Sequence, residues 1–409
     1  MKRKANERII GWADLPNDIV KLIVGHLDFG SLRSLLVTCK SMVEYLKRIK
    51  AEINEIVEYS PTKDRLICFI KHLCVKEVTP KLLELKKIHT LDLSNGYGEW
   101  SKMLVDVSSF GIFHTVRLNG RCVVNVSALG NVHSLDLSFT NVMNVSALGK
   151  VHTLFLRHTN VIDVSALVNV HILDLSFSDS LLDVSALGNV HTLNLSFTNV
   201  VDVSALGNVH ELDLSNTNVV DVSALGNVHT LDLSNTKVTD VSVLCHVHTL
   251  NLFRTHVVDV SALGNAHALY LWNTKITDVS SLGKVHSLNL SNTRVVDVSA
   301  LGNVHSLSLS QTKVVDVSAL GKVHSLNLSL TRVVDVSALG NVYSLDLSHT
   351  DVVNVSALGN VHILDLSFTD VVDVSALGNV HSLDLSGTDA MDISALGNVK
   401  KLEPPKNFA

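Results

Sequence analysis

Histidine, serine and aspartate recur along this chain at fixed spacing, and these residue types bind metals or catalyse hydrolysis in other proteins. Imidazole is a common metal ligand, and a serine, a histidine and an aspartate together form the triad of many hydrolases. The step between successive histidines is 19 residues, apart from one 20-residue step and one replacement by Tyr343. The series runs through His114, His133, His152, His171, His191, His210, His229, His248, His267, His286, His305, His324, His362 and His381.

The regularity of this series argues against both chemistries. A structural zinc site needs four converging ligands, whereas these histidines would form a line about 4.8 Å apart on neighbouring strands. Asp136 and Ser138 recur with His133 in nearly every unit, so no copy forms the unique constellation that catalysis requires. We therefore expect no catalytic residue, no metal site and no cofactor. Crowded imidazoles should protonate poorly, so we predict a loss of stability between about pH 6.5 and 5.

The histidine belongs to a repeated unit, V-H-x-L-x-L-S-x-T-x-V-V-D-V-S-A-L-G-N, which must be explained first. In the copy that begins at Val132, Leu135 and Leu137 alternate with polar residues, which predicts a short strand with one buried face. Val142, Val145 and Leu148 follow at spacings that suit a tight return or a 3₁₀ turn. Gly149 should end that return with a backbone free of Cβ strain. One unit cannot bury its leucines, but stacked units can.

The repeat resembles the leucine-rich-repeat superfamily, L-x-x-L-x-L-x-x-N-x-L, in its short bacterial and SDS22-like subtype. The resemblance covers about residues 82–402, in some sixteen units that start at His89. It implies a solenoid with a parallel β-sheet on its concave face and a thin convex side without α-helices. Threonine takes the ninth position at Thr140, Thr159 and onward, where the family has asparagine, so we expect a hydroxyl ladder in place of an asparagine ladder.

A different pattern occupies the N-terminal segment. Asp14 can cap a helix whose first turn contains Pro16, and Ile19, Ile23 and Leu27 share one helical face. The sequence Asp28-Phe29-Gly30-Ser31 interrupts that helix, and two more short helices are predicted from Leu32 to Val37 and from Lys40 to Ile49.

This run, LPNDIVKLIVGHLDFGSLRSLLVTCKSM, resembles the F-box over residues 14 to about 50. The resemblance implies binding to a Skp1-like subunit of a cullin-RING ubiquitin ligase. Met42 stands where the family usually has tryptophan, a volume that methionine can fill flexibly. The alternative is a helical cap that only shields the first repeat from water. The residues that the resemblance assigns to Skp1 binding are Leu15, Pro16, Ile19, Val20, Ile23, Leu27, Leu32, Leu35, Val37 and Met42.

These features predict an α+β repeat protein made of five segments. They are a basic tail at 1–10, the F-box-like helical domain at 11–50, a helical linker and N-cap at 51–88, the solenoid at 89–403 and a tail at 404–409. Residues 1–87 carry a net charge of +6 and residues 88–409 one of −12. An acidic solenoid lacks the basic stripe of a nucleic-acid track, and no signal peptide or membrane span is recognisable.

The face that binds a target is expected where units depart from the consensus. One group is Phe155, Arg157 and His158, and the other is Phe253, Arg254, Tyr270 and Trp272, with His256 close by. Exposed aromatics and arginine dominate interface hot spots, although drift between duplicated units would also produce such departures. Phe139, Phe177, Phe197 and Phe368, each just before the repeat threonine or serine, are further candidates.

Taken together, these patterns predict a non-enzymatic adaptor that is monomeric by itself and works inside the cell. Residues 14–50 would bind a Skp1-like protein within a cullin complex, while the concave face binds an unknown protein target. The near-identical units indicate recent expansion, as in viral arrays that engage a host ubiquitin system. The alternative is a leucine-rich-repeat scaffold or adhesion protein with no ubiquitin role.

Overall fold

The computed structural model describes residues 57–58, 72–74, 89–94 and 105–406. The chain divides into two compact units, Met1–Thr159 and Asn160–Ala409. Both units are built from three-residue or shorter strands that pair in parallel with the strand of the next turn along the chain. This is the parallel sheet that the repeat predicts.

The first unit begins its sheet earlier than the sequence predicts. Its strands pair in chain order, each with the next. They are β1 (Val57–Glu58), β2 (His72–Cys74), β3 (Thr90–Asp92), β4 (Thr115–Arg117), β5 (Ser134–Asp136) and β6 (Thr153–Phe155), with 3₁₀ helices η4 (Phe110–Ile112) and η5 (Ser127–Leu129).

The prediction of a helical linker over residues 51–88 is wrong at both stretches described there. Leu73 pairs with Leu91 in register, and Val57 pairs with Leu73, so β1 and β2 extend the repeat sheet. Short apolar runs such as IVEY and ICFIKHL fit a helix and a buried strand equally well by periodicity. Pairing with the neighbouring strand decides the outcome here, because strand preference depends on sheet context more than on the residue itself.

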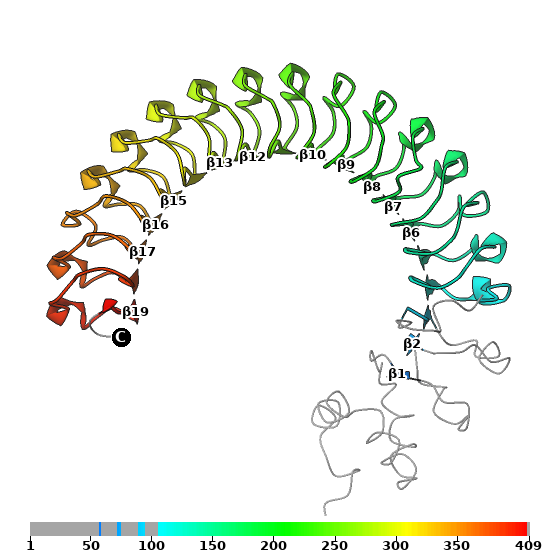
Figure 1. Cartoon of the computed structure of the whole chain (residues 1–409), viewed down its shortest axis with the longest axis horizontal. Coiled ribbons are helices and arrows are strands. Elements are labelled where there is room, and N and C mark those ends of the chain that lie inside the picture. The colour runs from blue at the N-terminus through cyan, green and yellow to red at the C-terminus, as the bar shows by residue number, and fades with distance from the viewer. Residues whose placement is uncertain (1–56, 59–71, 75–88, 95–104, 407–409) are drawn as a thin grey trace, which may run out of the picture. The chain divides into compact units, whose positions relative to one another are not determined.

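The second unit repeats one turn along a curved stack (Figure 1). Its strands are β7 (Ile172–Asp174), β8 (Thr192–Asn194), β9 (Glu211–Asp213), β10 (Thr230–Asp232), β11 (Thr249–Asn251), β12 (Ala268–Tyr270), β13 (Ser287–Asn289), β14 (Ser306–Ser308), β15 (Ser325–Asn327), β16 (Ser344–Asp346), β17 (Ile363–Asp365), β18 (Ser382–Asp384) and β19 (Lys401–Glu403). Its 3₁₀ helices are η6 (Ser165–Leu167), η7 (Ser185–Leu187), η8 (Ser242–Leu244), η9 (Ser261–Leu263), η10 (Ser280–Leu282), η11 (Ser299–Leu301), η12 (Ser318–Leu320), η13 (Ser337–Leu339), η14 (Ser375–Leu377) and η15 (Ser394–Leu396).

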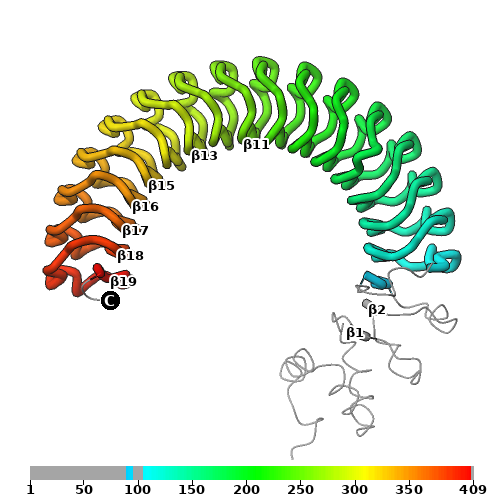
Figure 2. Tube along the Cα trace, in the orientation of Figure 1, coloured from blue at the N-terminus to red at the C-terminus, as the bar shows by residue number. Residues whose placement is uncertain are grey.

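Within the second unit, strands lie on the inner side of the curve and the 3₁₀ helices lie on the outer side (Figure 1). The tube of Figure 2 shows the same turn repeated from one end of this unit to the other. This arrangement confirms the predicted sheet on the concave face and the thin convex side. Paired strands are about 4.8 Å apart, and because they lie on the shorter, inner arc, successive outer turns are spaced more widely than the strands (Figure 1).

Leucine and valine columns fill the space between the two sides. In the turn that contains β13, Leu288, Leu290, Val295, Val298 and Leu301 are all at most 2% exposed. The neighbouring turns place leucine, valine or isoleucine in the same positions, so each of these side chains packs between its counterparts in the turns on either side. Fully burying such a side chain contributes about 1.5–3 kcal/mol, and only the stack buries it fully.

The threonine column differs from the expected hydroxyl ladder. The Thr293 hydroxyl donates to the carbonyl oxygen of Leu290 at 2.6 Å, and the Thr312 hydroxyl donates to that of Leu309 at the same distance. Each bond closes a turn within its own unit and spans three residues. The length of the side chain explains the difference. Threonine is short, so its hydroxyl reaches the carbonyl three residues earlier in its own repeat more easily than it reaches the next repeat.

The repeat glycine is required for a different reason from the one predicted. Gly302 has φ −61°, an ordinary right-handed conformation. A Cβ built there would lie only 2.4 Å from the carbonyl oxygen of Ala319 in the next unit. Glycine therefore permits close stacking of the outer turns. Cys245 and Val168 occupy the same place in two other repeats.

No helix in the described part of the chain is long and apolar enough to cross a lipid bilayer.

Candidate protein-binding face

The inner face of the second unit is mainly polar. In β11, Thr249 and Asn251 are partly exposed on either side of the buried Leu250, and most other strands carry serine, threonine, asparagine or aspartate at these positions. A shallow hollow of about 370 Å³ lies over β12 to β16, bordered by Tyr270, Asn289 and Asp346 among others. Small polar side chains thus leave room for a partner on this face.

An aromatic cluster interrupts that polar surface after β11 and β12. Phe253 and Trp272 replace the consensus serine in adjacent units, and their rings stack with centroids 3.5 Å apart and an interplanar angle of 13°. The guanidinium carbon of Arg254 lies 4.9 Å from the centroid of the Phe253 ring. An exposed contact of this kind contributes about 0.5–1 kcal/mol. Trp272 remains 38% exposed, so the stack presents an apolar surface to solvent.

Hydrogen bonds fix the backbone beneath the cluster. The Leu252 N–H donates to the Tyr270 carbonyl at 2.8 Å. The side-chain oxygen of Asn251 accepts the Phe253 N–H at 3.1 Å, and its amide donates to Asp232 at 2.8 Å. Tyr270 is 37% exposed and borders the hollow. The structure therefore brings Phe253, Arg254 and Trp272 into contact and places Tyr270 beside the adjoining hollow.

The other predicted group lies in the first unit, at the end of β6. Phe155 is partly buried, while Arg157 and His158 are exposed. The Phe139 N–H donates to the Arg157 carbonyl at 2.7 Å, and the Phe139 ring stacks on His158 with centroids 4.7 Å apart. The partner of His158 in this stack is thus Phe139, which the sequence flagged only as a subsidiary candidate.

A column of left-handed residues follows the strands, and sequence reasoning missed it. The residue just before the repeat threonine has positive φ in unit after unit, including Phe197 at 55°, Arg254 at 55° and Leu330 at 57°. Such conformations strain residues that carry a Cβ. The signal was present: Asn216 and Gly387 occupy this position in other units, and asparagine and glycine tolerate the left-handed region.

Aromatic residues at this strained position stack on their neighbours. Phe177 and Phe197 stack with centroids 4.3 Å apart and an angle of 8°, and His349 and Phe368 stack at 4.5 Å and 5°. Phe368 remains 55% exposed. These phenylalanines therefore form exposed apolar ridges at the ends of the strands.

The histidine series forms a column of stacked rings on the opposite margin of the sheet. In the second unit, successive ring centroids are 4.5–4.7 Å apart, and Tyr343 continues the stack between His324 and His362. Partial desolvation, followed by the like charge of neighbouring imidazoles, lowers the pKa of His248 and His286 below 6.5. His114 in the first unit has a lowered pKa for the same reasons. Among the described residues, no three histidine, cysteine or acidic side chains are placed to hold a metal ion.

The aspartates that resemble a catalytic triad bind backbone groups. Asp136 accepts the Ser138 N–H at 2.9 Å, and Asp213 accepts the Ser215 N–H at 2.8 Å. Burial, followed by the charges of neighbouring aspartates, raises the pKa of Asp213. A second aspartate column opens each 3₁₀ turn: Asp297 accepts the Ser299 N–H at 2.9 Å, and hydrogen bonds from Ser299 lower the pKa of that carboxyl. These carboxylates organise turns.

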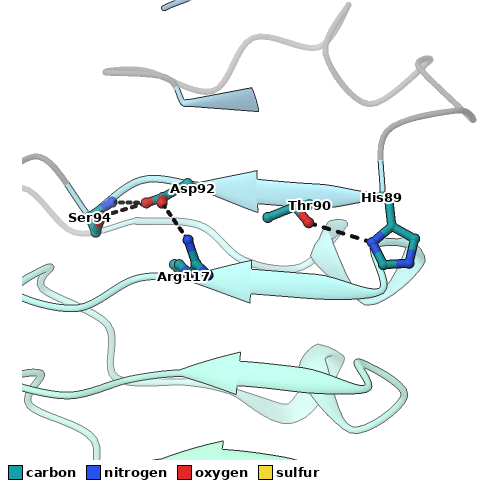
Figure 3. Close-up of polar contacts among 5 residues, drawn as sticks. All are labelled: His89, Thr90, Asp92, Ser94 and Arg117. Atoms are coloured by element: carbon teal, nitrogen blue, oxygen red, sulfur yellow. Dashed lines mark hydrogen bonds and ion pairs between the residues drawn. The ribbon is translucent and has the colours of Figure 1, made fainter. Parts of the chain in front are cut away.

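An ion pair joins the neighbouring strands β3 and β4 in the first unit (Figure 3). Arg117 in β4 donates to Asp92 in β3 at 3.3 Å, and the same carboxylate accepts the Ser94 N–H at 2.9 Å. His89 lies at the other end of β3, 3.5 Å from the Thr90 hydroxyl. Asp92 thus links two neighbouring repeats of the first unit and closes the turn after its own strand.

The residues predicted to bind a Skp1-like protein lie outside the described residues. They are Leu15, Pro16, Ile19, Val20, Ile23, Leu27, Leu32, Leu35, Val37 and Met42. Sequence comparison covers this segment instead: the F-box domain family matches residues 12–48. This match confirms the resemblance that the Leu-Pro opening and the short apolar runs indicated.

Structural comparisons identify the fold of the repeats. The chain is similar to a leucine-rich-repeat protein of Leptospira interrogans, LIC12759, with 17% identity, a TM-score of 0.61, and coverage of 86% of this chain and 100% of that one. It is also similar to the functional domain of InlJ from Listeria monocytogenes, with 18% identity, a TM-score of 0.57 and 74% coverage of each chain. No curated protein matches the chain by sequence.

A third similar structure is that of Toll in its complex with Spatzle from Drosophila, with 16% identity and a TM-score of 0.53 over 81% of this chain and 53% of that one. At these identities the likeness concerns the fold alone. The chain therefore carries an F-box domain at residues 12–48 and a parallel-strand solenoid with the leucine-rich-repeat fold.

Proposed function

We propose that this protein is a substrate-recognition adaptor of an SCF-type ubiquitin ligase. The observation that carries the proposal is the presence, in one chain, of an F-box domain and a leucine-rich-repeat solenoid with an aromatic cluster on its inner face. F-box domains bind Skp1-like proteins in general, and the solenoid offers a separate surface for a target. The adaptor itself would be non-enzymatic and intracellular, with ubiquitin transfer carried out by other subunits of the cullin complex.

The target would bind first at the second predicted group. Phe253 and Trp272 present stacked rings, Arg254 adds a cation above them, and Tyr270 borders the adjoining hollow. Aromatic and arginine side chains of this kind supply most of the binding energy in protein interfaces. Small polar residues on β13 to β16 would let the target lie close to the strands. Phe155, Arg157 and His158 are proposed as a further contact.

The link to ubiquitin is tested by co-purification with Skp1. A Pro16→Ala/Ile19→Asp variant should lose Skp1, because it alters the F-box opening and places a charge on its apolar face. The unmodified chain should retain Skp1 under the same conditions. Retention of Skp1 by both proteins, or by neither, would refute the adaptor proposal and favour a scaffold with no ubiquitin role.

The target surface is tested by affinity capture and mass spectrometry with a quadruple Phe253→Ser, Arg254→Ser, Tyr270→Ser and Trp272→Ser variant. We expect specific target proteins to be lost while Skp1 is retained, since the F-box domain is unchanged.

A matched control for this experiment removes exposed apolar side chains elsewhere in the solenoid. Val220→Ser and Val258→Ser change residues that are 52% and 56% exposed on the side of the stack. This control should retain both Skp1 and the target. Equal target recovery with the quadruple variant and the control would show that the aromatic cluster is not the binding site.

A further inference from the structure

One exposed column on the side of the second unit carries a run of charges that is complementary to itself. The residue directly after the repeat threonine is exposed in every one of these turns, and we call this series the flank column. It comprises Lys237, His256, Lys275, Arg294, Lys313, Arg332, Asp351, Asp370 and Asp389. Six consecutive basic or titratable cationic residues are therefore followed by three consecutive acidic ones.

The position of the flank column follows from the chain path. Each member lies between a strand of the inner face and the outer turn that follows it, which is a 3₁₀ helix in every case except that of Asp351, so the column runs along one side of the curved stack. The Arg294 N–H donates to the Ile276 carbonyl of the preceding unit at 3.0 Å, and Asp373 pairs with Asp392 in a parallel bridge. Pairing between units on this side keeps the column at one residue per unit.

An apolar column lies beside the charges. Residues alternate in an extended segment, and Val333, between Arg332 and Val334, is fully buried. The charged residue and the residue two positions later consequently point to the same side. The resulting exposed series is Val296, Val315, Val334, Val353, Val372 and Met391, each more than half exposed.

The order of the charges defines a two-fold relation. Reversing the column about the midpoint between Arg332 and Asp351 places Arg332 opposite Asp351, Lys313 opposite Asp370 and Arg294 opposite Asp389. In an isologous dimer each such pair occurs twice. In the part of the chain that the structure describes, none of the three cations forms an ion pair, so they are available to a partner.

We propose that two copies of this chain associate through the flank column, antiparallel, about a two-fold axis along the radius of the curve. A two-fold rotation about a radial axis reverses the chain direction of the second copy. It also brings the flank column of one copy to face that of the other, and both stacks remain curved around the same centre. Two curved stacks can therefore stay in register along the whole shared segment. The apolar columns then meet, Val334 against Val353 of the second copy, and the inner faces remain open for targets.

The aspartate of each Asp-Val-Ser turn also affects the proposed dimer, because it lies near the contact between the two copies. These aspartates follow the apolar column directly and would also approach their counterparts. At the midpoint, however, Asn354 replaces aspartate, so Asp335 would meet a neutral amide of the second copy. Farther out, Asp316 would approach Asp373 of the second copy, but each of these carboxylates is turned back to accept a serine N–H at 2.9 Å. The apposition is thus least repulsive at the axis.

Sedimentation velocity of the full chain tests the proposal. The unmodified chain should dimerise with a Kd that rises with salt concentration, since exposed ion pairs are screened. A triple acid-to-lysine variant, Asp351→Lys, Asp370→Lys and Asp389→Lys, should weaken dimerisation by about tenfold or more. Substitutions at such exposed positions change folding stability little.

The reciprocal variant, Arg294→Asp, Lys313→Asp and Arg332→Asp, should be monomeric as well. Mixing the two triple variants should restore a heterodimer, because the acid-to-lysine variant then carries six cations along the shared segment and the reciprocal variant carries six anions. This rescue cannot arise from misfolding of either variant.

A matched control is available in the same column. Lys237→Asp and Lys275→Asp reverse charges that would face no flank residue of the second copy, and dimerisation should persist. A monomeric unmodified chain at about 100 µM, triple variants that still dimerise, or a mixture that stays monomeric would overturn the proposal. Capture of an acidic protein by the cationic half alone, without self-association, would assign the column to a different partner and would likewise overturn it.

Discussion

Replacing Thr293 by valine should destabilise the solenoid locally by about 1–2 kcal/mol. Valine has nearly the shape of threonine but lacks the hydroxyl that donates to the Leu290 carbonyl at 2.6 Å. Thr293 is only 6% exposed, so water cannot replace that donor freely. The magnitude lies in the lower part of the cost of leaving one buried acceptor poorly satisfied, about 1–3 kcal/mol, which replaces the average net value of a hydrogen bond, about 0.5–1.5 kcal/mol, when only one partner is removed.

A serine substitution at the same residue separates the hydroxyl from the methyl group. Thr293→Ser keeps the donor and loses one buried methyl, which should cost about 0.8 kcal/mol or less. Valine should therefore be the more damaging change. A serine variant that is less stable than the valine variant would show that packing, and not the hydrogen bond, explains the threonine column.

The double variant tests whether neighbouring hydroxyls act together. Because Thr293 and Thr312 each bond within their own unit, the effects of Thr293→Val and Thr312→Val should add within about 0.5 kcal/mol. Native-state hydrogen exchange of the amides in β13 and β14 measures the local opening, which suits a long array better than a single global transition. A coupling above about 1 kcal/mol would refute the reasoning and support a ladder between units.

Three further predictions concern the ring stack, the strained turn and the outer turns. The lowered pKa of His114 and of His286 means that the unfolded chain takes up protons first, so stability present above about pH 6.5 should fall as the pH drops towards 5; a melting temperature that is constant over this range would contradict it. Leu330→Asn should raise stability by up to about 1 kcal/mol in denaturant titrations, since asparagine tolerates the left-handed conformation better; a loss of stability would show that leucine packs usefully there. Gly302→Ala should lower stability by about 1–3 kcal/mol in the same assay, because its Cβ meets the Ala319 carbonyl; an unchanged midpoint would show that the stack spacing adjusts freely.

The sequence predicts the repeated core well because every repeat carries the same pattern of apolar residues. Leu288 and Leu290 alternate with polar residues, and the same alternation returns 19 residues later, so strand, register and parallel pairing follow together. The short spacing of Val298 and Leu301 likewise leaves room for little more than a 3₁₀ turn. The F-box domain could be recognised from residue pattern, and a family match at 12–48 confirms it.

Features that depend on contacts between units were harder to predict. The alanine carbonyl that excludes a Cβ at Gly302 belongs to the next unit, so the sequence suggested a conformational role instead. Val57 and Leu73 join the sheet although their surroundings have helical spacing, because an existing strand edge provides their hydrogen bonds. The contact between Phe253 and Trp272 required the register that places consecutive units side by side.

The two proposed surfaces can be separated because they use different sides of the same repeat. A side chain in the consensus serine position, such as Trp272, belongs to the end of a strand, whereas Arg332 belongs to the segment that leads towards the outer turn. Substitutions in one set leave the buried leucines and the other set unchanged. Substitutions can therefore abolish target binding while self-association persists, or abolish self-association while target binding persists. Variants that always lost the two properties together would mean that the target binds the dimer and not either face alone.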